Sequence, residues 1–201
     1  MLARPPVRMF LYLLSCFGAE IVPFSLLNDQ DLPPGVRGIY LGGGFPEVFS
    51  ARLSANHAMK ASIRDFHSAG GVIYAECGGL MVLCEALVDF EGCRHEMIGL
   101  VPAVSVMRRD KLSLGYVEVE TLKGTVIAGV GENYRAQTFH YSVLENARFE
   151  PALKVRHGAN VSYDGYVNRN LFATYIHAHF AASPTLAQRF VDRCRAGIAV
   201  H

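Results

Sequence analysis

The sharpest change of hydrophobic pattern along the chain falls at Cys77. Residues 72–74 are Val, Ile and Tyr, which are typical of a buried β-strand. After the cysteine, apolar residues recur at the spacing of a helix, at Leu80, Met81, Leu83, Cys84 and Leu87. The pattern therefore predicts a strand that turns sharply into a helix, with the cysteine at the turn.

A second strand is predicted upstream. Residues 38–41 are Gly-Ile-Tyr-Leu, and three glycines follow at 42–44. Residues 48–69 then show an apolar face at helical spacing, and two glycines end this predicted helix. Strand, glycine loop, helix, strand and cysteine turn form a βαβα order, which implies parallel strands joined by a right-handed crossover. The glycine loop and Cys77 then lie at the same carboxyl edge of the sheet.

The remaining segments complete a single domain. Residues 18–24 predict a helix end that leads into a strand, and residues 93–130 contain short apolar runs separated by glycines, typical of short strands. Residues 171–180 predict another buried strand, and residues 182–195 predict an amphipathic helix. The whole predicts an α/β fold with a mostly parallel sheet and helices on both faces.

Composition narrows the classes of partner. The 201 residues suffice for one domain with a sizeable core. Lys and Arg total 19 and Asp and Glu total 18, so no net charge favours binding to nucleic acid or to a membrane. The five cysteines contain no CxxC pair, which argues against a disulfide framework and a zinc site and favours the reducing cytoplasm. The apolar run at 9–17 is too short to span a bilayer.

Cys77 is the first candidate for chemistry. Ala75 and Gly79 are small, so the strand and the helix can approach closely, as at a nucleophile elbow with sulfur in place of oxygen. Free backbone N–H groups at a helix start at Gly78 would favour the thiolate and stabilise an oxyanion. The alternative is a buried structural cysteine, which is the commoner state of a free Cys, but the small neighbours favour the elbow.

The glycine loop at 42–44 is the second candidate. Glycines leave backbone N–H groups open to a ligand or to a reacting carbonyl, although the glycines alone fit a tight turn equally well. No Gly-Lys-Ser/Thr follows this loop or occurs elsewhere. The chain therefore has no phosphate loop, and ATP chemistry is not visible in it.

Two histidines form the third candidate. A thiol is a weak nucleophile until a histidine accepts its proton. His177 and His179 face the same way if the predicted strand continues through both. We favour a base for Cys77 over a metal site, because no third ligand is apparent. The cluster at 135–142 contains Tyr141 and a further histidine, and a histidine beside aromatic residues is more often structural than catalytic.

Four stretches, in the same order along the chain, carry a family resemblance. They are 41–47 (Leu-Gly-Gly-Gly-Phe-Pro-Glu), 74–81 (Tyr-Ala-Glu-Cys-Gly-Gly-Leu-Met), 139–142 (Phe-His-Tyr-Ser) and 175–180 (Tyr-Ile-His-Ala-His-Phe). Together they resemble the glutamine amidotransferase domain of cobyrinic acid a,c-diamide synthase, a class I glutamine amidotransferase of the cobyrinic/cobyric acid synthase branch. The resemblance extends from about Gly18 to Arg195 and implies a flavodoxin-like α/β fold.

The resemblance also implies roles for individual residues. Family members bind L-glutamine, attack its side-chain amide with the elbow cysteine, release ammonia and hydrolyse the γ-glutamyl thioester. Cys77 is then the nucleophile, and His177 is the base and later the acid. The implied oxyanion and glutamine-binding groups are Gly43, Gly44 and Gly78, and the implied supporting residues are His179, Glu76 and Tyr141. No metal is implied at the site.

The sequence departs from the family pattern at three places. In class I amidotransferases a Glu two residues beyond the catalytic histidine orients the ring. His179 stands there, as in the cobyrinic acid branch, so we expect a Cys–His dyad. Residues 136–138 are Ala-Gln-Thr where the family usually has Gly-His-Glu. Residues 1–17 replace the usual start of the domain, which then covers 18–201, and the first strand is either missing or replaced by this segment.

The full-length synthases resemble a fusion of this domain with an N-terminal synthetase domain. That domain has a phosphate loop, activates corrin carboxylates with ATP and Mg²⁺ and accepts the ammonia. We therefore expect no cofactor in this chain, and a P-loop synthetase domain or subunit with a corrinoid substrate as its partner. The expected role is the glutaminase part of a synthase that amidates the a- and c-side-chain carboxylates of cobyrinic or hydrogenobyrinic acid in cobalamin biosynthesis. Two alternatives stay open, a non-catalytic docking module and a cysteine hydrolase of another amide.

Overall fold

A computed structural model describes residues 5–197, with side chains from Met9 onwards. Four strands form its central sheet, in the spatial order β1 (Gly38–Leu41), β2 (Val72–Glu76), β12 (Leu171–Thr174) and β11 (Tyr166–Asn168). β2 is parallel to both of its neighbours, whereas β11 is antiparallel to β12. The two predicted strands at 38–41 and 72–74, their parallel pairing and a mostly parallel central sheet are confirmed.

Two further sheets contain the other strands. One is antiparallel throughout, in the order β10 (Asn160–Asp164), β9 (Leu153–His157), β6 (Ser113–Thr121), β7 (Asn133–His140) and β13 (His177–Ala178). The other has the order β4 (Arg94–Glu96), β3 (Cys84–Val88), β5 (Val101–Met107) and β8 (Ser142–Glu145), and only β3 and β5 are parallel in it. Three strands form within 93–121, as predicted for the first part of 93–130, but the apolar run at 126–127 forms no strand. The division of these strands between two sheets is not visible in the sequence.

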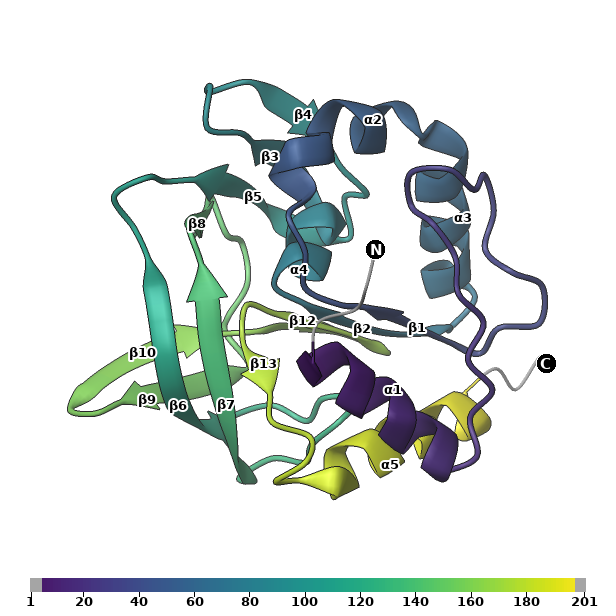
Figure 1. Cartoon of the computed structure of the whole chain (residues 1–201), viewed down its shortest axis with the longest axis vertical. Coiled ribbons are helices and arrows are strands. Elements are labelled where there is room, and N and C mark those ends of the chain that lie inside the picture. The colour runs from purple at the N-terminus through teal and green to yellow at the C-terminus, as the bar shows by residue number, and fades with distance from the viewer. Residues whose placement is uncertain (1–4, 198–201) are drawn as a thin grey trace.

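Helices cover both faces of the central sheet (Figure 1). One face carries α2 (Ser50–Ala55), α3 (His57–Ser68) and α4 (Gly78–Leu83), preceded by the 3-10 turn η1 (Pro46–Phe49), and the other carries α1 (Pro5–Cys16) and α5 (Pro184–Ala196). Alternate side chains of β2 point to opposite faces, so Ile73 and Ala75 join one hydrophobic core while Val72 and Tyr74 join the other. The prediction of helices on both faces is confirmed, but the single helix predicted over 48–69 is divided at Asn56 into α2 and α3.

Two predicted elements are shorter than their apolar patterns indicate. The helix after Cys77 ends at Leu83, and the following residues form β3, so Leu87 lies in a strand. The strand predicted over 171–180 ends at Thr174, and β13 then pairs with β7 in another sheet. Both segments are almost wholly buried, and an apolar run without polar interruptions cannot separate a helix from a strand by its period.

The helix α1 is part of the second core. Phe10 is 0% exposed, and its ring stacks on Phe180 with 4.0 Å between centroids and meets Tyr40 edge-on at 4.5 Å. The helix ends at Cys16, and Gly18 follows as the predicted helix end, with φ +83° and an N–H that donates to the Ser15 carbonyl at 2.9 Å. The strand predicted within 18–24 does not form, and among residues 5–197 β1 pairs only with β2.

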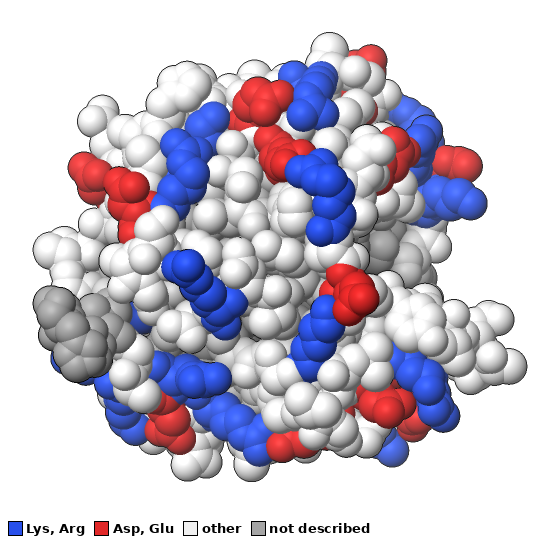
Figure 2. Space-filling model, turned by 180° about the vertical axis from the view of Figure 1, so that it is seen from behind, with Lys and Arg blue, Asp and Glu red and all other residues white. Residues whose placement is uncertain are grey.

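The surface carries charges of both signs. On the face seen from behind, Lys and Arg are interspersed with Asp and Glu around an uncharged centre (Figure 2). Among the described helices, none has the length and apolar character needed to cross a membrane.

We expect the substitution Phe10→Ala to destabilise the fold by about 3 to 5 kcal/mol, because it removes a fully buried ring and leaves a cavity between α1, α5 and the sheet. Urea unfolding followed by circular dichroism measures this change. The matched control is Tyr12→Ala on the same helix, where the side chain is 65% exposed and the loss should stay within about 0.5 kcal/mol. Equal effects of the two substitutions would show that α1 does not pack as described.

Candidate active site

The elbow at Cys77 has the geometry that the sequence predicts. β2 ends at Glu76, α4 begins at Gly78, and Cys77 between them has φ 50° and ψ −106°. A positive φ at a non-glycine residue costs on the order of 1 to 3 kcal/mol and persists only where neighbouring contacts enforce it. Here the Cys77 N–H donates to the Thr174 carbonyl at 2.8 Å, and its carbonyl accepts from Met81 N–H at 3.1 Å.

Close backbone contacts explain the glycines after the cysteine. A Cβ on Gly79 would lie 2.2 Å from the Leu41 carbonyl oxygen, and a Cβ on Gly78 would lie 2.8 Å from the Gly44 nitrogen. Only glycine allows such an approach without displacing backbone. The start of α4 therefore lies directly against the end of β1 and the glycine loop. The backbone N–H groups of Gly43, Gly44 and Gly78 donate no hydrogen bond within the described part of the chain.

His177 reaches the site from another sheet. After β12 the chain crosses to β13, where His177 is paired in register with Gln137 of β7. Its ring lies over the glycine loop, so closely that a Cβ on Gly43 would be 2.6 Å from Cε1. A residue that is distant from Cys77 in the sequence is thus brought next to the elbow by strand pairing.

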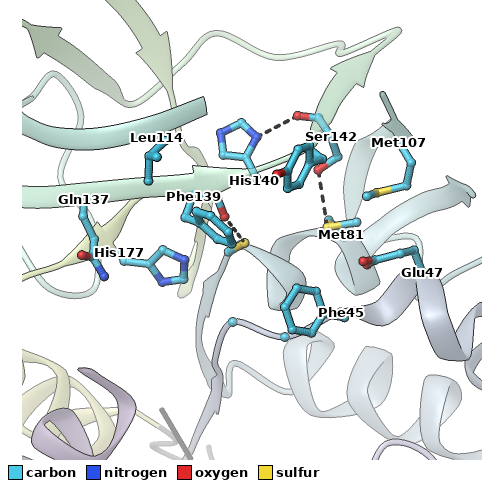
Figure 3. A pocket seen from close by; sticks show the side chains of 14 residues that line it. Phe45, Glu47, Met81, Met107, Leu114, Gln137, Phe139, His140, Ser142 and His177 are labelled. Atoms are coloured by element: carbon cyan, nitrogen blue, oxygen red, sulfur yellow. Dashed lines mark hydrogen bonds between the residues drawn. The ribbon is translucent and has the colours of Figure 1, made fainter. Parts of the chain in front are cut away.

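One cavity of about 260 Å³ unites most of the predicted site residues (Figure 3). Cys77, His177, Gly43, Gly44 and Tyr141 all line it. The other lining residues are Phe45, Glu47, Met81, Met107, Leu114, Gln137, Phe139, His140 and Ser142. The volume is slightly below that of pockets for drug-sized ligands, about 300 to 1,000 Å³, and so suits a ligand of the size of an amino acid.

The thiol and the imidazole interact inside this cavity. Cys77 is 7% exposed, and its Sγ donates to the Phe139 carbonyl at 3.5 Å. Burial alone would lower the pKa of His177, but polar contacts with Cys77 and Glu76 and the negative charges of these groups outweigh it and raise the pKa to about 10. At neutral pH His177 is therefore an imidazolium beside the sulfur, and a cation in this position activates a cysteine as a nucleophile.

The other two predicted supporting residues lie in different places. Glu76 is 3% exposed, and its Oε2 is 3.5 Å from Nδ1 of His177. His179 does not line the catalytic cavity. It lines a separate cavity of about 670 Å³ together with Arg135 and Arg156. The reason is the early end of β13, because His177 and His179 would share one face only in a strand that continued through both.

Several residues of the site are not evident from the sequence. Phe139 and Met81 lie in stretches that carry the resemblance, and Gln137 lies in one that departs from it, but none of the three has a role implied by the sequence. Strand pairing and the position of α4 bring them to the cavity. Tyr40 could only be recognised as a strand residue, yet its hydroxyl donates to Glu76 at 2.8 Å. Within the described residues, no group of three His, Cys, Asp or Glu side chains is placed to hold a metal ion.

Comparison with protein families gives one match that covers most of the chain. The family model described as "CobB/CobQ-like glutamine amidotransferase domain" matches residues 11–185. The chain is similar to the cobyrinate a,c-diamide synthases of Leptospira interrogans, with 44% identity over 88% of the chain, and of Dehalococcoides mccartyi, with 39% identity over 94% of it. It is also 38% identical, over 91% of its length, to the hydrogenobyrinate a,c-diamide synthase of Streptomyces coelicolor. The matched part is 40%, 43% and 36% of these three proteins, so the chain spans about two fifths of their length.

Solved structures agree on the fold. A crystal structure described as a glutamine amidotransferase superposes with a TM-score of 0.63 at 14% identity, covering 94% of this chain and 93% of that one. The structure of PurLQS from Thermotoga maritima superposes with a TM-score of 0.64 at 15% identity, covering 94% and 91%. The predicted glutamine amidotransferase fold is confirmed.

We expect Gly43→Ala to slow alkylation of Cys77 by iodoacetamide at pH 7 by about tenfold, because the new methyl group would displace the His177 ring, the group that accepts the thiol proton. Intact-protein and peptide mass spectrometry give the rate at this cysteine. Gly124→Ala is the control, since no atom lies within 4 Å of its Cβ position. An unchanged rate in Gly43→Ala would mean that His177 does not activate the sulfur.

Proposed function

The chain belongs to the CobB/CobQ-like glutamine amidotransferase family, and we propose that it hydrolyses the side-chain amide of glutamine at Cys77. The observation that carries the proposal is the meeting of Cys77 and His177 in one amino-acid-sized cavity, beside backbone N–H groups that have no partner within the described residues. These are the three components that acyl transfer from an amide requires: a nucleophile, an acid–base group and oxyanion donors.

The first half of the reaction releases ammonia. The Cys77 thiolate attacks the amide carbon of glutamine, and the carbonyl electrons move to oxygen. The N–H groups of Gly78 and of the loop at Gly43 and Gly44 hold this oxyanion, a contribution of about 3 to 4 kcal/mol per donor in hydrolases. The imidazolium of His177 gives its proton to the amide nitrogen, the C–N bond breaks, and ammonia leaves a γ-glutamyl thioester on the sulfur.

The second half restores the site. His177, now neutral, takes a proton from a water molecule that attacks the thioester carbon. The C–S bond breaks, glutamate leaves, and the thiolate and the imidazolium are paired again. The net change is glutamine plus water to glutamate plus ammonia, with no cofactor.

We also propose that the ammonia passes to a synthetase part that uses ATP and Mg²⁺ to activate a carboxylate of cobyrinate or hydrogenobyrinate. Two facts support this: the relatives named for these syntheses are more than twice as long as the chain, and the mouth of the cavity is apolar. Phe45 before η1, Leu114 in β6 and Tyr141 between β7 and β8 line the cavity and are 40%, 59% and 37% exposed. A partner that covers them would keep ammonia from water, where it becomes the non-nucleophilic ammonium ion.

We expect Cys77→Ala to abolish glutamine hydrolysis by the purified chain, because it removes the sulfur that His177 contacts in the cavity. Coupled glutamate dehydrogenase measures the glutamate formed. Cys93→Ala is the matched control, since Cys93 is exposed and lies outside the cavity. A glutamine-analogue electrophile should label Cys77 in preference to the other cysteines. Undiminished hydrolysis in Cys77→Ala would exclude the mechanism.

The pH profile gives an independent expectation. Ammonia release needs the protonated form of His177, and its pKa is raised to about 10. The value of kcat/KM should therefore stay high through neutral pH and fall only as the pH rises through about 10. Initial rates between pH 6 and pH 11 measure this fall of kcat/KM. A fall near the ordinary histidine pKa of about 6.5 would contradict the pairing of His177 with Cys77 and Glu76.

A further inference from the structure

The carboxylate of Glu76 is enclosed at the last position of β2, directly before the nucleophile. Its Oε1 accepts a hydrogen bond from the Tyr74 hydroxyl and one from Ala178 N–H at 3.1 Å. Its Oε2 accepts from the Tyr40 hydroxyl at 2.8 Å and lies 3.5 Å from Nδ1 of His177. Every partner of this carboxylate is therefore a donor or a potential cation.

We propose that Glu76 is the positioning residue of His177, and that it supplies the orienting carboxylate that the chain lacks two residues beyond the histidine. Its contact with Nδ1 leaves Nε2 as the nitrogen that exchanges a proton with the sulfur and with the leaving group. The inference rests on the proposed function, and it adds the third group of the site.

The enclosure gives the carboxylate of Glu76 the hydrogen-bond donors that this role needs. A buried carboxylate is stable as an anion only where hydrogen-bond donors surround it. Burial raises the pKa of Tyr40 and of Tyr74 well above the ordinary value, and the charge of Glu76 adds to the effect, so both hydroxyls stay protonated and donate. The fourth neighbour is His177, whose positive charge the carboxylate stabilises.

Glu76 also fixes the backbone that carries the imidazole. Ala178, which donates to Oε1, is the residue after His177, so one carboxylate holds both the ring and the peptide that follows it. A distance of 3.5 Å to Nδ1 is long for a hydrogen bond, and such contacts often tighten only when substrate is bound.

The other titratable neighbours do not perform this task. Cys77 is the partner of the ring on its reactive side. Burial lowers the pKa of His140, whose Nδ1 is hydrogen-bonded to the Ser142 carbonyl at 2.8 Å, so it is neutral at pH 7. His179 lies in the other cavity, and its N–H donates to the Arg135 carbonyl at 3.1 Å.

The test uses the purified chain with Glu76→Gln, which keeps the size of the side chain and removes its charge. We expect kcat for glutamine hydrolysis to fall on the order of 10²-fold, with KM changed less than about threefold. The high-pH limb of kcat/KM should move down by about one pH unit or more, because the imidazolium loses its anionic partner. Glu76→Asp keeps a carboxylate but places it farther from His177. Its kcat, and the pH at which its kcat/KM falls, should therefore lie between those of Glu76→Gln and those of the unmodified chain. His179→Gln is the control and should leave both unchanged.

A second readout separates this inference from the proposed function. NMR of ¹³C-labelled histidine gives the pKa of His177 directly, without glutamine. If the unmodified chain does not hydrolyse glutamine but the pKa of His177 falls in Glu76→Gln, the proposed function is wrong and the positioning role stands. If Glu76→Gln keeps both its kcat and the pKa of His177, the positioning role is wrong and the proposed function stands. If Glu76→Gln loses its native circular dichroism spectrum, Glu76→Asp decides the same question. Its kcat, and the pH at which kcat/KM falls, should both be lower than in the unmodified chain. If both values are unaltered, the positioning role is wrong.

Discussion

The site depends on how closely the backbone of α4 approaches the end of β1. The position of a Cβ on Gly79 lies only 2.2 Å from the Leu41 carbonyl oxygen, so the two segments meet with no side chain between them. This contact places the glycine loop after β1 beside Gly78. It also forces the chain to reverse at Cys77, at a cost of about 1 to 3 kcal/mol for its positive φ. The hydrogen bond from Cys77 N–H to Thr174 on β12 helps to hold this strained residue in place.

The buried carboxylate of Glu76 links the reactive groups to the hydrophobic core. Tyr74 donates to it, and the Tyr74 ring lies parallel to Phe172 at 5.6 Å and edge-on to Phe10 at 5.8 Å. Phe10 belongs to α1, and Phe180 stacks on it from the segment after β13. The packing of α1 and α5 against the sheet therefore also sets the position of the group next to His177. Core packing and the geometry of the site are coupled through one tyrosine.

The sequence predicts the parts of the site that local geometry controls. The turn at Cys77 and the glycines around it are visible because a change of period and the absence of Cβ atoms leave a local pattern. The resemblance implies that His177 is the base for Cys77, and the structure brings its ring to the cavity that Cys77 lines. The sequence does not show that His179 lies away from Cys77. Its position depends on the pairing of β13 with β7, about 40 residues upstream, and on the end of β13 after two residues. The hydroxyl of Tyr40 is equally hidden, because a tyrosine in an apolar strand looks like a core residue until its partner is known.

The same geometry explains why the orienting acid comes from β2. Position 179 lies in a cavity lined by Arg135 and Arg156, so a carboxylate there would face guanidinium groups and not the catalytic imidazole. Position 76 is different. The chain reverses at Cys77, so the sulfur enters the cavity, whereas the side chain of Glu76 lies among Tyr40, Tyr74 and the peptide N–H of Ala178. One strand end then supplies both the nucleophile and the acid that orients its base. The register between β2 and β12, in which Glu76 pairs with Thr174, sets the spacing of all three groups, since His177 follows Thr174 by three residues.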